Sequence, residues 1–162
     1  MTEVQVVPQS SMSADVVSGV AQFLGPVVVD LTALAVDGKQ AHWHVRGANF
    51  QAVHELLDEV VEHAHDYADT AAERVVALGL PLDVRIQTVG SKTTTPALSA
   101  GFQQSDAVIA QIIASIDATL VTVRTAVEEL GTLDAVSQDV AIEIARGLEK
   151  DRWFLFAHLA TK

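Results

Sequence analysis

Apolar residues recur at intervals of three and four along four long segments of this chain, which is the period of an α-helix that buries one face. The segments span residues 13–45, 50–78, 106–130 and 134–160. They predict an all-α protein with four long helices. Gly25-Pro26 interrupts the first segment. Because an internal proline removes a hydrogen bond and clashes with the preceding turn, we expect a kink there or a fresh helix start at Pro26.

Small and polar residues mark the ends of the predicted helices. Gly47 can adopt a positive φ in the first turn, and Asn49 is a good N-cap for the second helix. Gly79 is well placed as the C-cap of that helix, because Pro81 prevents its continuation. Gly131 separates the third helix from the fourth.

Residues 80–104 form a long connection rich in threonine, glycine and proline. This connection is too long for a hairpin between antiparallel neighbours. We therefore predict a four-helix bundle with one long crossover between the second and third helices, carrying a short helix over residues 96–101. The bundle would form a single domain over residues 13–162, and the polar residues 1–12 would form a flexible tail.

Composition limits the cellular setting and the chemistry. The chain has no cysteine, so any bound metal must accept nitrogen and oxygen ligands. Hydrophobic residues make up 49% of the chain, which is high for a small soluble monomer, and subunit interfaces would cover part of them. The N-terminus lacks the features of a secretory signal, and no stretch has eighteen uninterrupted apolar residues. We therefore predict a cytoplasmic protein.

The charge balance argues against nucleic acid as a partner. The formal net charge is −11, which repels phosphate polymers and attracts cations. The tail over residues 1–12 has no lysine or arginine, and the first cation in the chain is Lys39. Phosphate binding needs clustered positive charge, so the tail cannot supply it.

Six metal-competent side chains share one face of the second helix, within a stripe roughly 100° wide at about 100° per residue. They are His54, Asp58, Glu62, His65, Asp69 and Glu73. Asp58 and Asp69 are eleven residues apart, which is roughly 16 Å along a helix, whereas the ligands of one ion converge to about 2 Å from it. The stripe thus contains two half-sites. The first half-site is His54 with Asp58, and the second half-site is Asp69 with Glu73.

A second copy of this helix could complete both half-sites. In an antiparallel pair related by a two-fold axis, the first half-site of one chain faces the second half-site of its mate, and the reverse is also true. Each dimer would carry two equivalent metal sites. His42, from the preceding segment, could reach in as a further ligand.

The run KQAHWHVRGANFQAVHELLDE, followed by DTAAER, resembles the Dps-type miniferritins, the DNA-binding proteins from starved cells in the ferritin-like superfamily. The motif of that family is an HW pair, then H-x-x-x-D, then D-x-x-x-E-R. It is matched here by His42, Trp43, His54, Asp58, Asp69, Glu73 and Arg74. A weaker likeness reaches LEKDRWFLF near the C-terminus.

The resemblance implies a ferritin-like bundle and a ferroxidase centre shared between two subunits. One subunit would provide His42, His54 and Asp58, and the other would provide Asp69 and Glu73. It also implies a hollow dodecamer that oxidises Fe²⁺ with hydrogen peroxide or oxygen, stores the ferric mineral and so limits oxidative damage. Zinc or manganese remain alternative metals, because imidazole and carboxylate accept them too.

Two further groups of residues are accessory candidates. Glu62 and His65 match the Glu-x-x-His motif of di-iron sites inside one bundle, but such sites need a second copy of the motif on another helix, and none is present. We therefore treat both as accessory metal residues. His44 and His63, which lie outside the motif, are treated as surface or accessory groups. The resemblance also implies acidic pores at three-fold axes, for which Asp139 and Glu143 are candidates.

Three alternatives to iron oxidation remain open. A metal at the same centre could activate water for the hydrolysis of an amide or ester, although no substrate pocket or oxyanion hole is visible in the sequence. A DNA-binding protein is disfavoured by the acidic charge and the tail without lysine or arginine. A metal-free structural bundle is the third alternative.

Overall fold

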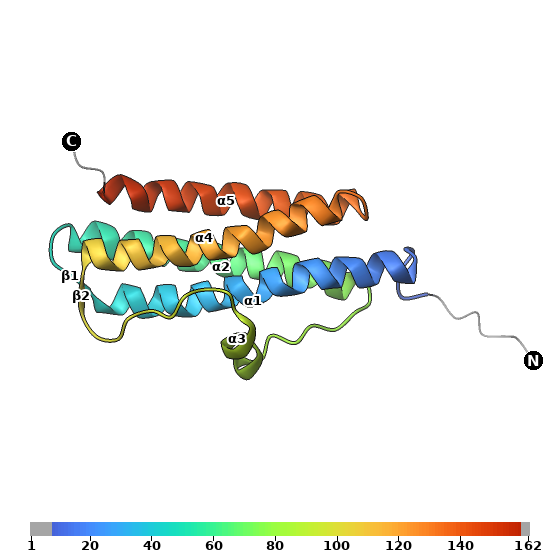
Figure 1. Ribbon diagram of the computed structural model, residues 1–162, viewed down its shortest axis with the longest axis horizontal. Coiled ribbons are helices and arrows are strands. Elements are labelled where there is room, and N and C mark those ends of the chain that lie inside the picture. Colours follow the sequence, from blue (N-terminus) through green and yellow to red (C-terminus); the bar gives the residue numbers. More distant parts are fainter. Residues whose placement is uncertain (1–7, 160–162) are drawn as a thin grey trace, which may run out of the picture.

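The computed structural model describes residues 8–159, in which four long helices form a bundle (Figure 1). The long helices are α1 (Ala14–His44), α2 (Phe50–Ala77), α4 (Ser105–Leu130) and α5 (Ala135–Leu159). A short helix, α3 (Ile86–Lys92), and two short strands, β1 (Val45–Arg46) and β2 (Gln103–Gln104), complete the described part. The predicted four-helix bundle is confirmed. Most of the predicted tail, residues 1–7, lies outside the described residues.

The core lies between two helix pairs. α1 packs against α2, α4 packs against α5, and α1 also contacts α4. Each long helix contributes fully buried side chains, such as Leu24, Leu57, Ile112 and Leu148. Burying one leucine or isoleucine stabilises the fold by roughly 1.5–3 kcal/mol. The predicted helical periodicity therefore identified the faces that form the core.

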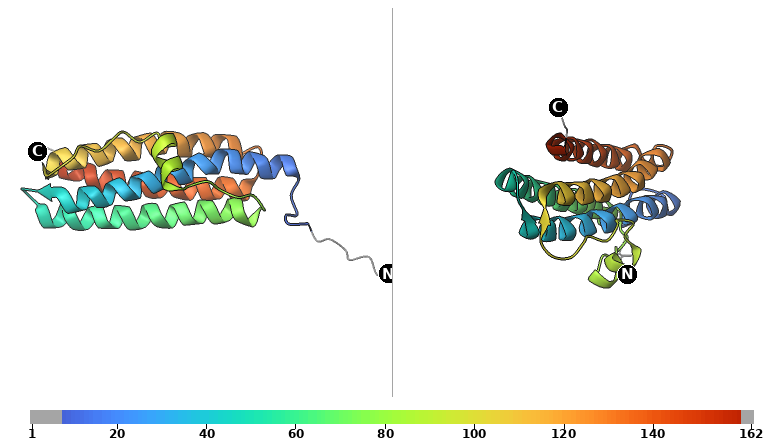
Figure 2. Two further views of the ribbon diagram at one scale, coloured as in Figure 1. Left: turned by 90° about the horizontal axis from the view of Figure 1, so that it is seen from below. Right: turned by 60° about the vertical axis from the view of Figure 1, so that its left-hand side comes forward.

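The crossover between α2 and α4 runs along the outside of α1 and α4 (Figure 2). It is held by the carboxylate of Asp30, a residue of α1 that is only 1% exposed. Asp30 accepts hydrogen bonds from Thr93 Oγ1 at 3.0 Å, and from the backbone N–H and Oγ1 of Thr94 at 2.7 Å each. Thr122 Oγ1, on α4, donates a fourth bond at 2.7 Å. A buried carboxylate thus joins the crossover to two long helices.

Near the other end of the crossover, β2 pairs in parallel with β1, which directly follows α1. Val45 is opposite Gln103, and Arg46 is opposite Gln104. Ser105 Oγ then donates to the carbonyl oxygen of Ala48 at 2.7 Å. These contacts fasten the α1–α2 turn to the start of α4.

Three local predictions differ from the structure in whole or in part. Asn49 occupies the N-cap position of α2 as predicted, but its side chain makes no capping hydrogen bond, and its backbone is left-handed with φ 56°. The short helix of the crossover lies at Ile86–Lys92, and residues 96–101 are not helical. α1 continues through Pro26 without a fresh start, whereas the alternative, a kink, stays a prediction. Proline deprives the carbonyl of Gln22 of its helical partner, but both residues are exposed, so water can replace the lost bond.

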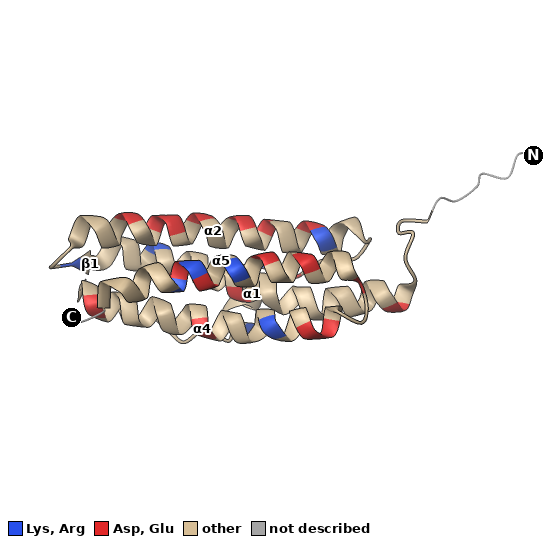
Figure 3. Ribbon diagram, turned by 90° about the horizontal axis from the view of Figure 1, so that it is seen from above, with Lys and Arg blue, Asp and Glu red and all other residues tan. Residues whose placement is uncertain are grey.

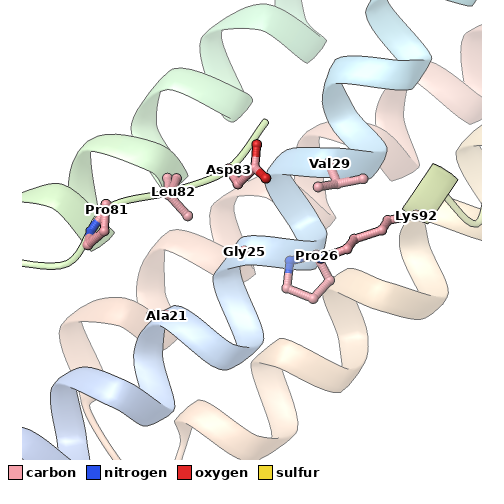
Figure 4. Close-up of a pocket in the computed structure, with 8 residues that line it drawn as sticks. All are labelled: Ala21, Gly25, Pro26, Val29, Pro81, Leu82, Asp83 and Lys92. Carbon is pink, nitrogen blue, oxygen red and sulfur yellow. The ribbon is translucent and has the colours of Figure 1, made fainter. Parts of the chain in front are cut away.

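A hollow opens beside Pro26, where the start of the crossover meets α1 (Figure 4). Gly25 leaves room there for Leu82, whose nearest methyl carbon would be 3.8 Å from a Cβ at Gly25. Asp83 and Lys92 provide the charged groups at its rim.

By length and composition, α1 and α4 are apolar enough to cross a membrane, which the sequence analysis did not anticipate. In their most apolar windows, 56% and 50% of the residues are buried inside the bundle. Both helices supply core side chains, so packing within the bundle accounts for their apolar character.

We predict that Asp30→Ala loosens the crossover. It would remove the buried acceptor shared by Thr93 and Thr122, which are half-buried, and by Thr94, which is exposed. The loss of these hydrogen bonds to a charged group should lower the free energy of unfolding by roughly 2–4 kcal/mol. Urea unfolding would measure the loss, and limited proteolysis should show faster cleavage within residues 80–104. Glu128→Ala, at an exposed position on α4, is the control. Equal cleavage rates in the two variants would contradict the assigned role of Asp30.

Candidate metal centre

The imidazole rings of His42, on α1, and His54, on α2, are stacked with their centroids 3.6 Å apart. His42 Nδ1 lies 2.8 Å from the carbonyl oxygen of His54, and His54 Nδ1 lies 2.9 Å from the carbonyl oxygen of His42. A carbonyl oxygen only accepts, so each Nδ1 carries a hydrogen and each neutral ring keeps a free lone pair on Nε2. Hydrogen bonds of this kind fix the tautomer and orientation of metal-binding histidines.

Asp58 lies one turn after His54 on α2, and its carboxylate accepts a hydrogen bond from Nζ of Lys39 on α1. His42 Nδ1 is 3.9 Å from the same carboxylate oxygen. The hydrogen bond from Lys39 holds the pKa of Asp58 below its ordinary value, against a smaller opposing effect of burial. One chain therefore places His42 beside both residues of the first half-site, although these three side chains alone are not grouped so as to hold a metal ion. A metal ion bound to Asp58 would take the place of the Lys39 ammonium.

The second half-site lies far along the same helix. Asp69 and Glu73 are exposed, and α2 is unbroken from Phe50 to Ala77. The rise of a continuous helix puts Asp69 roughly 16 Å beyond Asp58. Among residues 8–159, no three His, Asp or Glu side chains are grouped so as to hold a metal ion. One chain therefore presents the two half-sites separately.

Arg74 follows Glu73 and fastens the end of α2 to the start of α5. Its Nη2 donates to Asp134 Oδ2 at 2.7 Å, and its Nε donates to Ser137 Oγ at 2.9 Å. The backbone N–H of Ser137 donates to the same Asp134 oxygen at 2.9 Å, which caps α5. Burial raises the pKa of Asp134, but hydrogen bonds from Ser137 and Arg74 outweigh it and lower the pKa to about 2.

The accessory candidates do not join either half-site in the single chain. Glu62 and His65 are exposed on α2 between the two half-sites. Asp139 and Glu143 are exposed on α5. Acidic residues recur along α2 and α5, as Figure 3 shows, so these helices present a surface that favours cations.

Sequence reasoning missed one pair, because it left His63 as a surface or accessory group. His63 Nδ1 is 2.9 and 3.1 Å from the two carboxylate oxygens of Asp151 on α5. The two residues are 88 positions apart, so no local spacing connects them. One signal was available: Asp151 falls at core spacing between Leu148 and Leu155, where a buried acid needs a partner.

Comparison with known proteins agrees with the fold and the motif. A family model described as a ferritin-like domain matches residues 24–162. The structure of Dps from Microbacterium arborescens in the high iron form has a TM-score of 0.91 and 58% identity, and covers 94% of this chain and 99% of that one. The DNA protection during starvation protein of Mycolicibacterium smegmatis is 34% identical over 88% of this chain and 78% of its own length. Its namesake from Agrobacterium fabrum is 30% identical over 95% of this chain and 96% of its own length.

We predict that the Arg74–Asp134 pair makes stability sensitive to acid. The folded-state pKa of Asp134 is about 2, below the ~3.9 of an unfolded aspartate. Its contribution is therefore present above about pH 4 and lost as the pH falls toward about 2. Arg74→Met should reduce the free energy of unfolding near neutral pH and flatten its dependence on pH over that interval.

Urea unfolding at a series of pH values measures this slope. Arg146→Met, which removes an exposed guanidinium from α5, is the control and should keep the wild-type slope. If Arg74→Met also kept the wild-type slope between about pH 4 and 2, the pair would not be the cause.

Proposed function

Because this chain belongs to the Dps family of ferritin-like proteins, we propose that two copies jointly bind ferrous iron, oxidise it and store the ferric product. The proposal rests mainly on the paired imidazoles of His42 and His54, each with a free Nε2, beside the carboxylate of Asp58. Imidazole and carboxylate ligands suit iron, zinc or manganese better than softer ions. The relative solved in a high iron form supports iron.

The second half-site of each centre would come from another chain, since α2 holds it too far from the first. Two copies of α2 packed antiparallel about a two-fold axis would bring unlike half-sites together twice. One ferrous ion would be held by His42 and Asp58 of one subunit together with Glu73 of the partner subunit. A second, weaker position would use His54 and Asp69 of the partner subunit, directly or through water.

Two ferrous ions at one centre can each give one electron to the same molecule of hydrogen peroxide. Two Fe²⁺, one H₂O₂ and two protons then yield two Fe³⁺ and two waters, so the O–O bond breaks without releasing a hydroxyl radical. Carboxylates suit this step, because their negative charge stabilises Fe³⁺ more than Fe²⁺. Oxygen is the alternative oxidant. Consuming iron and peroxide together would limit oxidative damage in the cytoplasm, where we propose that the protein acts.

The stored mineral requires an assembly with an interior, for which we propose a hollow dodecamer built from two-fold dimers. Large apolar side chains remain exposed on the single chain, among them Trp43 (62%), Trp153 (64%) and Phe156 (51%). Soluble monomers rarely expose so many, so subunit interfaces account for them. We further propose that Asp139 and Glu143 line pores through which ferrous ions enter, because both are exposed carboxylates on one helix.

Direct binding of DNA is not part of the proposal, although the relatives are named for DNA protection. Within residues 8–159, five cations are already in ion pairs with carboxylates. They are Lys39, Arg74, Arg85, Arg124 and Arg152. The net charge of −11 opposes contact with phosphates. Protection would follow from the removal of iron and peroxide.

A metal-dependent amide or ester hydrolase is the rival use of the same centre. A hydrolase needs room for an organic substrate beside the metal. The hollow of Figure 4 is lined by Pro26, and His42 is sixteen residues further along α1, a separation of roughly 24 Å. Another hollow, between α2 and α5, is lined by Glu59 and Trp153 and by no residue of the proposed centre. Because neither hollow is lined by His42, His54 or Asp58, iron oxidation is favoured over hydrolysis.

We predict that replacing both His42 and His54 with glycine abolishes the fast phase of iron oxidation. The rate should fall roughly 100-fold or more, since losing two ligands exceeds the 10–100-fold cost of losing a supporting hydrogen bond. Stopped-flow absorbance of the ferric product measures the rate. His44→Gly is the matched control, because His44 bonds the carbonyl of Gln40 and stands outside both half-sites. An unchanged progress curve in the double variant would refute the assignment.

A mixing experiment tests whether two chains share each centre. One variant carries His54→Gly with Asp58→Asn, and the other carries Asp69→Asn with Glu73→Gln, so each alone should be inactive. In a mixed dimer one centre combines two intact half-sites. Co-assembly at equal amounts should therefore restore about a quarter of the wild-type rate. No recovery, in co-assembled chains verified by mass, would exclude a shared centre.

A further inference from the structure

His63 lies on the opposite side of α2 from His54. The two residues are nine positions apart, which turns His63 about 180° around the helix and toward α5. Its Nδ1 faces both carboxylate oxygens of Asp151. The Asp151 side chain is 5% exposed, whereas that of His63 is 40% exposed. The buried carboxylate of Asp151 therefore holds the Nδ1 side of the His63 imidazole, and the other side of this ring is open to solvent.

This arrangement leaves His63 ready to bind a cation. An ionised carboxylate only accepts hydrogen bonds, so Nδ1 carries the hydrogen and the neutral ring has its lone pair on Nε2. A carboxylate behind an imidazole also raises the basicity of the other nitrogen, an arrangement found behind metal-binding histidines. The alternative role of the His63–Asp151 contact is a structural ion pair, in which a protonated His63 neutralises Asp151.

Carboxylates from two helices surround His63. Glu59 is exposed one turn earlier on α2, at a spacing that makes the two side chains neighbours. Burial raises the pKa of the Tyr67 phenol, and so do the charges of Asp151, Glu143 and Asp66. Carboxylates on both α2 and α5 therefore contribute negative charge around His63 and Tyr67. Burial raises the pKa of Asp151, against the lowering effects of His63 and Lys150.

We propose that His63 Nε2 and the carboxylate of Glu59 bind a divalent transition-metal cation, with Asp151 as the positioning residue behind the imidazole. Nitrogen and oxygen ligands of this kind suit Zn²⁺ and Fe²⁺. No third protein ligand is grouped with them among residues 8–159, so water fills the remaining positions. The site is open, and its ion can exchange.

The link to iron storage rests on the proposed function, but the site itself does not. The exposed side chains of Glu62 and Asp66 lie between His54 and His63 around the circumference of α2. Counted from His54, their rotations about the helix axis are about 80° and 120°. This carboxylate surface would let a cation that leaves the shared centre reach His63 without crossing an apolar region.

The test uses Zn²⁺, which is not oxidised, and the full assembled protein carrying His42→Gly and His54→Gly. Anomalous diffraction from zinc-soaked crystals should show an ion about 2.0–2.1 Å from His63 Nε2. In calorimetric titration, His63→Gln should remove about one Zn²⁺ per chain. Asp151→Asn should weaken this binding roughly 10–100-fold. Glu55→Gln, at an exposed carboxylate two turns before His63, is the control and should retain the ion.

Zinc-soaked crystals of the protein with His42 and His54 intact, in which both centres can form, separate this site from the shared centre. Zinc between chains with none at His63 would overturn this inference and leave the proposed function standing. Zinc at His63 with none between chains would support this inference and contradict the proposed function. If His63→Gln lowered the melting temperature but left zinc stoichiometry unchanged, the pair with Asp151 would be an ordinary ion pair and the inference would be wrong. His63 is half-exposed, so its glutamine variant is expected to fold even where Asp151→Asn does not.

Discussion

A continuous α-helix keeps its side chains at fixed spacings, and this rigidity governs everything proposed for α2. Asp58 and Asp69 stay roughly 16 Å apart whatever their rotamers, so one chain cannot close both half-sites around one ion. Both ends of the helix are also tied down. The β1–β2 pair holds the turn before it, and Arg74 joins its last turn to Asp134 of α5. Each half-site is therefore presented rigidly, and under the proposed function a second rigid copy completes it.

Electrostatics then couple assembly to the cation. In the single chain, the ammonium of Lys39 offsets the charge of Asp58. When a second chain brings Asp69 and Glu73 to the same place, three carboxylates face one ammonium, and the excess negative charge opposes association unless a cation enters. A metal ion that binds the assembled centre more tightly than the separate chains stabilises the assembly by mass action. Iron binding and dimer formation should thus support each other.

The sequence predicted the long helices, the crossover and the contents of both half-sites, because each depends on spacing within one segment. It could not predict contacts between distant segments. Asp30 fixes the crossover through threonines more than sixty residues away, directly after the end of α3. The fresh helix start that was one of two expectations at Pro26 does not occur, since core packing on both sides of the proline maintains α1. The composition of the candidate centre stays a prediction, because its other half belongs to a second chain.

The two histidines of α2 show how one helix can support two kinds of metal ligand. His54 is held by a neutral carbonyl oxygen of α1, which orients its ring without placing a formal charge behind it. His63 is held by the buried carboxylate of Asp151, which adds negative charge behind the ring. A centre built on His54 therefore depends on carboxylates for charge, including those of a partner chain, whereas one built on His63 takes its charge from within the same chain. Oxidation that needs two ions would then belong at the shared boundary, and reversible binding of one ion would belong on the α2–α5 face.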